Sequence, residues 1–236
     1  MKLTFRKGLS HGIPIALGYL SVSFGFGIMA VKSGIPAINA IIISLTNLTS
    51  AGQAAGVGII AAGGAILEMA ATQFVINLRY SLMGLSLSQK LDKSFTTIHR
   101  MVASYGITDE IFAVASSQKE KLVPSYMYGL ISISALGWTC GTAAGAFAGN
   151  ILPASVTAAM GILLYGMFIA IIVPAAKNSR KDLLVICFAA AFSMAFKYLL
   201  PGVSFGFAII LSSIAASVIG AILFPIELAE SESEIT

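Results

Sequence analysis

The chain has 236 residues, of which 57% are hydrophobic and only 10% are charged. Soluble domains carry charge on roughly 25% of their residues, so this composition excludes a soluble fold and indicates an all-α integral membrane protein. The 14 basic and 10 acidic residues give a net charge of +4, which we interpret as an orientation signal at the bilayer and not as a nucleic-acid-binding charge.

Charges are so rare that the gaps between them outline the first membrane elements. The first gap runs from Gly8 to Val31, which predicts one uncleaved span, because a span needs about 20 apolar residues. The next two elements are expected at 36–62 and 65–88, with a turn at Gly63-Gly64 between them.

The second half of the chain begins with the densest charge, at residues 89–121. Two spans are expected in 122–176, which contains no charge, and two more in 183–226. The sequence therefore predicts a polytopic bundle of about seven or eight transmembrane or re-entrant helices. We expect it to form a single transporter domain, 1–226, followed by an acidic, disordered cytoplasmic tail, 227–236.

Basic clusters at Arg6-Lys7 and at Lys119 to Lys121 define the orientation. If both lie in the cytoplasm, an even number of crossings separates them. In one topology 36–62 crosses and 95–117 forms a fourth span, which gives eight elements. In the other, 36–62 is re-entrant and 89–121 is a cytoplasmic in-plane helix. Both place the two termini in the cytoplasm, and we favour the first because Met101 to Ser117 is apolar for a loop.

The most polar stretch inside an apolar segment runs from Thr46 to Gly56. Exposed to lipid it would be costly, so it should face protein or a water-filled cavity. Small and polar residues with Gly52 and Gly56 are typical of an interrupted helix, whose free N–H groups and positive dipole end can hold a carboxylate. The alternative is an unbroken helix with small residues for tight packing.

Ionisable residues at membrane depth are candidate functional residues. Glu68 can reach the interface and Lys197 can snorkel, but Arg79 lies about three turns beyond Glu68. Asp109 and Glu110 diverge by about 100° on a helix. One of them could therefore pair with Arg79, while the other meets an ammonium group or a proton.

Glycines recur at every fourth position on one predicted helix, at Gly137, Gly141, Gly145 and Gly149. Such a ridge lets two transmembrane helices approach closely. The partner is another helix of this chain or a separate subunit. The two cysteines are far apart, and no metal site, cofactor site or catalytic set can be assembled, so we expect no enzyme activity.

Four segments of the sequence form a recognisable pattern. The most specific is Asn77-Leu78-Arg79-Tyr80 continuing to Leu87. The others are His11-Gly12-Ile13-Pro14 with Gly18-Tyr19, Ser50-Ala51-Gly52-Gln53, and Thr108-Asp109-Glu110 followed by Phe112-Ala113. In this order they resemble the AzlC family, the large subunit of bacterial branched-chain amino acid exporters, and the resemblance covers about 5 to 224.

The resemblance implies secondary export of branched-chain or similar neutral amino acids across the bacterial cytoplasmic membrane. It also implies a small AzlD-like membrane subunit as partner, with protons as the candidate coupling ion. The alternatives are a channel and a non-catalytic structural or assembly subunit. Residues of the matching segments, together with the buried charges, make up the predicted substrate-binding set: Thr49, Ser50, Gly52, Gln53, Asn77, Arg79, Tyr80, Asp109 and Glu110.

Overall fold

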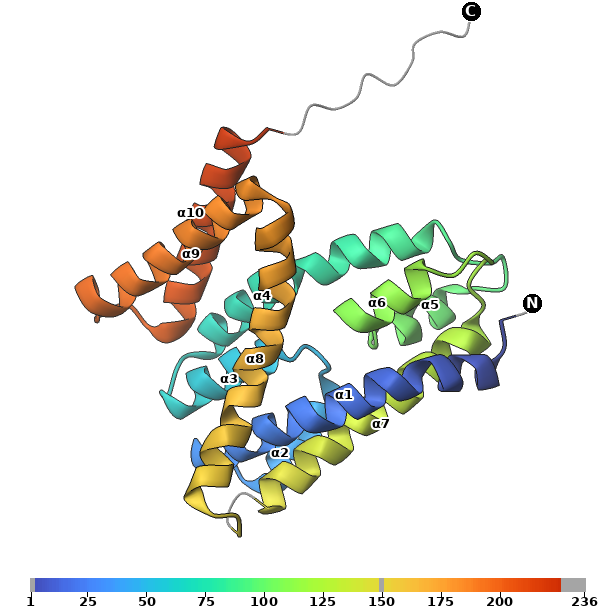
Figure 1. Cartoon of the computed structure of the whole chain (residues 1–236), viewed down its shortest axis with the longest axis horizontal. Coiled ribbons are helices and arrows are strands. Elements are labelled where there is room, and N and C mark those ends of the chain that lie inside the picture. The colour runs from blue at the N-terminus through green and yellow to red at the C-terminus, as the bar shows by residue number, and fades with distance from the viewer. Residues whose placement is uncertain (1–2, 149–150, 226–236) are drawn as a thin grey trace, which may run out of the picture. The chain divides into compact units, whose positions relative to one another are not determined.

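The computed structural model describes residues 3–148 and 151–225, and its regular structure is helical throughout these ranges, which confirms the predicted fold class (Figure 1). Each predicted apolar segment forms helix. The helices are α1 (Phe5–Lys32), α2 (Ala37–Thr46), α3 (Ala51–Ala61), α4 (Ile66–Ser88), α5 (Thr97–Ser104), α6 (Asp109–Ser116), α7 (Pro124–Ala148), α8 (Ala154–Asn178), α9 (Arg180–Leu199) and α10 (Phe205–Leu223).

Four of the described helices, α1, α7, α9 and α10, are long and apolar enough to cross a membrane. The shortest of them has 19 residues and is therefore about 28 Å long, close to the roughly 30 Å of a bilayer core. The chain is thus a polytopic helical membrane protein. It divides into two compact units, Met1–Met167 and Phe168–Thr236.

In the first unit, α1 and α7 lie side by side and run in the same direction (Figure 1). A Cβ atom added to Gly129 would meet Phe5 at the start of α1, and one on Gly145 would meet Phe24 near its end. Contacts therefore advance along both helices together. The buried core of this unit is centred on α7 and includes the fully buried Tyr126, Leu130 and Trp138.

The predicted glycine ridge is the α7 side of this interface. A Cβ on Gly137 would lie 2.5 Å from the carbonyl oxygen of Ala16, and Gly141 and Gly145 are equally tight against Leu20 and Phe24. Because no side chain fits there, the backbones can touch. The partner of the ridge is thus another helix of this chain, whereas Gly149 lies outside the described residues.

The interruption expected near 46–56 is present, since α2 ends at Thr46 and α3 begins at Ala51. Gln53 Nε2 donates to Ser44 Oγ at 3.0 Å and joins the two helices at the break. Away from the break, Ala40 of α2 and Val57 of α3 belong to one buried cluster with Phe26 of α1. Both arms therefore return to the same end of α1, and α2–α3 is a re-entrant pair.

The prediction that 95–117 forms a fourth span is wrong. The chain instead forms α5 and α6, two helices of eight residues, each only about 12 Å long. Thr108 starts α6 as an N-cap, its side chain accepting from the backbone N–H of Ile111. Leu122, which follows α6, donates its backbone N–H to the carbonyl of Lys90, which precedes α5, at 2.9 Å. The two ends of this segment therefore lie together at one end of the unit. It is a second re-entrant pair and not an in-plane surface helix.

Residues 5–61 and 66–116 therefore repeat one order of elements, a long helix followed by two short ones. The two long helices run in opposite directions. The end of α4 is tied through Lys90 to Leu122, next to the start of α7, which lies beside the start of α1. The two broken pairs thus enter from opposite ends of the unit.

The second unit contains α9 and α10, which pack antiparallel. Val185 near the start of α9 lies against Gly220 near the end of α10. Likewise, the Lys181 ammonium is 5.9 Å from the centre of the Phe224 ring.

Candidate functional site

The turns of the two re-entrant pairs meet beside the middle of α1 and α4 in the first unit. They enclose a small cavity of about 10 Å³, which is room for roughly one water molecule. Its walls come from α1, from the break between α2 and α3, and from α4, α6 and α7. The lining residues are Tyr19, Leu48, Ser50, Tyr80, Thr108, Asp109, Glu110 and Trp138.

Arg79 and Asp109 form an ion pair at the edge of this cavity. Arg79 Nη2 lies 2.9 Å from Asp109 Oδ2 and also donates to the Tyr80 hydroxyl at 3.1 Å. Asp109 is in the first turn of α6, where the positive end of the helix dipole further stabilises its charge. The expectation that one of the two acids pairs with Arg79 is therefore confirmed.

Glu110 has a different partner. The Tyr19 hydroxyl lies 2.5 Å from Glu110 Oε2 and 2.5 Å from Thr108 Oγ1. Its single proton can go to the carboxylate, while the Thr108 hydroxyl donates to the tyrosine oxygen. Tyr19 also packs edge-on against Trp138, with ring centres 5.2 Å apart. The adjacent acids Asp109 and Glu110 thus contact Arg79 and Tyr19 respectively, as expected from the angle between neighbouring side chains on a helix.

The start of α3 provides the other polar wall. Ser50, its N-cap, has φ +40° and makes no side-chain hydrogen bond to the helix. That backbone conformation is rare for a residue with a Cβ. The neighbouring Thr49 has a buried hydroxyl without a hydrogen-bond partner among the described residues. Ser50, at the positive end of α3, therefore lines the cavity together with two carboxylates, whereas Thr49 is not among the lining residues.

Three members of the predicted set support the broken helix instead of lining the cavity. Gln53 bonds Ser44, whose hydroxyl is 2.7 Å from that of Thr142 on α7. Asn77 Nδ2 donates to Gln73 Oε1 at 3.1 Å, and Gln73 Nε2 donates to the carbonyl of Gly52 at 2.7 Å. Gln53, Asn77 and Gly52 therefore hold α3 against its neighbours.

Four lining residues were absent from the predicted set: Tyr19, Leu48, Thr108 and Trp138. Tyr19 could have been found from an internal repeat, because Leu17-Gly18-Tyr19 of α1 matches Leu78-Arg79-Tyr80 of α4. Thr108 precedes two acids, as an N-cap often does. Leu48 and Trp138 carry no signal in an apolar sequence.

The two other charged candidates lie elsewhere. Glu68 is buried in the first turn of α4, far along that helix from Arg79. Lys197 is in the last turn of α9 and exposed, as expected for a snorkelling lysine.

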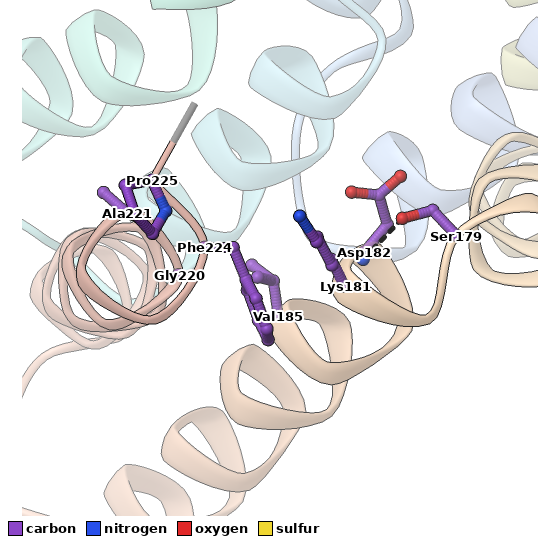
Figure 2. A pocket seen from close by; sticks show the side chains of 8 residues that line it. All are labelled: Ser179, Lys181, Asp182, Val185, Gly220, Ala221, Phe224 and Pro225. Carbon is purple, nitrogen blue, oxygen red and sulfur yellow. Dashed lines mark hydrogen bonds between the residues drawn. The ribbon is translucent and has the colours of Figure 1, made fainter. Parts of the chain in front are cut away.

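A larger pocket of about 850 Å³ lies in the second unit, between the start of α9 and the end of α10. Figure 2 shows Lys181 extending between the two helices, with Ser179 accepting from the Asp182 backbone N–H at 3.1 Å. This pocket is formed by helix ends, and its two charged lining residues, Lys181 and Asp182, are neighbours on one helix, whereas the charges in the first unit come from different helices. We therefore place the candidate site at the smaller cavity, because chemistry and not volume defines a site.

Comparison with known proteins places these observations in a family. Inner membrane protein YgaZ of Escherichia coli K12 is 32% identical over 200 residues, which cover 80% of this chain and 78% of that protein. An uncharacterized membrane protein of Archaeoglobus fulgidus is 31% identical over 176 residues, 74% of this chain and 77% of that protein. No solved structure is a significant match.

The family described as AzlC protein matches residues 14–152. This range contains every residue that lines the cavity. The chain therefore belongs to the AzlC family.

Proposed function

We propose that the chain is a secondary transporter that exports branched-chain or similar neutral amino acids. The observation that carries this proposal is the meeting of two oppositely inserted, broken helix pairs at a cavity bearing one cation and two carboxylates. Interrupted helices in inverted halves are the usual framework of substrate sites at the middle of the membrane. The branched-chain class itself rests on the family resemblance.

The charges around the cavity suit a zwitterion. The N–H groups at the start of α3, with Thr49 and Ser50, offer donors for the substrate carboxylate. Arg79 adds positive charge but is already paired with Asp109. Glu110, whose partner is a neutral tyrosine, is thus the better acceptor for the substrate ammonium group or the carrier of a coupling proton.

Transport requires this site to open. A cavity of about 10 Å³ does not hold an amino acid, so substrate can enter only when Tyr19 separates from Glu110 or the break of α2–α3 moves from α6. Because the two pairs enter from opposite ends, displacement of one opens the site to one face of the membrane and displacement of the other opens it to the opposite face.

Orientation and partner belong to the same proposal. Both α1 and α7 begin at one end of the first unit. The segments at that end carry the basic residues Lys7, Lys90, Lys119 and Lys121. The positive-inside rule makes this face cytoplasmic, with both termini in the cytoplasm of the bacterial cell. We further propose a small AzlD-like membrane subunit as partner.

The test is efflux of radiolabelled valine from reconstituted vesicles, with and without the neighbouring small subunit. Asp109→Asn and Glu110→Gln each keep the side-chain shape and remove the charge. We expect each to lower saturable efflux at least about tenfold, because charged hydrogen bonds contribute about 1.5–3 kcal/mol. Asp182→Asn, in the first turn of α9, is the matched control and should transport normally.

Three results would contradict the proposal. Unchanged efflux in both site variants, with normal protein yield, would remove these acids from the site. Flux that rises linearly with valine and never saturates would indicate a channel. Efflux by the small subunit alone would leave this chain a structural or assembly role.

A further inference from the structure

Trp138 carries an unused donor at the cavity. Its side chain is 2% exposed, and its indole Nε1 has no hydrogen-bond partner among the described residues. A buried N–H without an acceptor typically costs about 1–3 kcal/mol. Phenylalanine would occupy most of this space beside Tyr19 and would bury no unsatisfied N–H, so packing alone does not account for the indole.

The surroundings of Trp138 indicate which acceptor it could meet. Trp138 lines the same cavity as Ser50 and Glu110, and Thr49 has a second unpartnered, buried hydroxyl. Arg79 directs its Nη2 atom to Asp109 and Tyr80, and its Nε has no partner among the described residues, but Arg79 does not line the cavity. Among the residues that line the cavity, Trp138 is therefore the one whose buried side-chain donor has no partner in the described part of the chain.

We propose that the Trp138 indole N–H donates a hydrogen bond to the carboxylate of the bound amino acid. This inference rests on the proposed function and assigns the two ends of its substrate. The carboxylate lies between Trp138 and the start of α3, and the ammonium group lies at Glu110. Trp138 then selects molecules that carry an anionic group beside the amine.

The experiment uses the fact that Trp138 is the only tryptophan of the chain. Valine is titrated into the full-length protein while indole emission and thermal stability are recorded together. We expect a saturable change in emission with the same apparent Kd as the stabilisation. Valinol, which has the amine and side chain of valine but no carboxylate, should bind more weakly and change the emission less.

A substitution then isolates the N–H group. Binding to Trp138→Phe is measured by thermal stability alone, because the variant has no tryptophan. It should bind valine about tenfold more weakly and valinol with nearly unchanged affinity. The matched control is Tyr126→Phe, which deletes a polar group from another buried ring of α7, one that contacts His11 at 2.9 Å. It should leave the ratio of valine to valinol affinity as in the native protein.

The outcomes separate this inference from the proposed function. If valine stabilises the protein and is transported but indole emission does not change, or if Trp138→Phe weakens valine and valinol equally, the carboxylate assignment is wrong and the transport proposal survives. If valine neither stabilises the protein nor is transported, the proposed function fails and the inference fails with it.

Discussion

Arg79 and Asp109 are each only partly buried, with side-chain exposures of 36% and 26%. Their pairing joins α4 to the start of α6. The end of α6 is held by Lys90, whose ammonium group donates to the carbonyls of Ser116 and Gln118. The pair therefore contributes to the position of α6 as well as to the charge at the cavity. Solvent access limits its net contribution to about 1 kcal/mol.

A double-mutant cycle measures this coupling. Arg79→Gln and Asp109→Asn should each lower the thermal stability in detergent, because each leaves one charge without its partner. The double variant should lose less than the sum of the two, by about 1 kcal/mol. Additive losses would show that the two side chains do not interact in the folded protein.

The residues of the site differ in how far the sequence could identify them. Arg79, Asp109 and Glu110 are predictable because an ionisable group inside an apolar segment needs a reason to be there. Tyr19 and Trp138 are not, because aromatic rings in a membrane helix are usually packing residues. Gln53 belongs to the predicted set as the last residue of the matching segment Ser50-Ala51-Gly52-Gln53, but its amide bonds the hydroxyl of Ser44.

At the scale of helices, the α1–α7 interface depends on positions without side chains. Gly137→Ala should destabilise the protein by about 1–3 kcal/mol, because the new methyl group would meet backbone atoms of Ala16 at 2.5–2.9 Å. Thermal unfolding in detergent measures this change.

Gly18→Ala on α1 is the matched control. A Cβ there meets nothing within 4 Å, so it brings the same gain in helix propensity without the clash. Equal stability of the Gly137→Ala and Gly18→Ala variants would mean that α1 and α7 are not packed this closely.

The two breaks were not equally visible in the sequence. Thr46 to Gly56 contains enough polar and small residues to indicate an interruption, and α2 and α3 confirm it. The segment from Met101 to Ser117 has the apolar content of one continuous helix, so length and hydropathy favoured a span. The N-cap at Thr108 divides it, and capping is a local signal that hydropathy averages out.

For the whole molecule, the charges limit the topology without fixing it. If Arg6 and Lys119 both lie in the cytoplasm, as the positive-inside rule predicts, an even number of crossings separates them. Two arrangements satisfy that condition. Non-local contacts match neither arrangement completely: 36–62 is re-entrant, as in the second and not as in the favoured first, but 95–117 forms a re-entrant pair in place of an in-plane helix. The backbone bond between Lys90 and Leu122 closes the segment at one end of the unit, and the cluster of Ala40, Val57 and Phe26 closes the other pair at the opposite end.

Cysteine labelling tests this arrangement in intact cells. In a variant with Cys140 and Cys187 replaced by serine, a membrane-impermeant maleimide should react with Ala62→Cys from outside. Lys93→Cys and Lys119→Cys should both stay unlabelled until the membrane is permeabilised, because 93 and 119 flank a re-entrant pair and lie on the same face. External labelling at 93 with protection at 119 would instead place a complete crossing between them and restore the continuous span.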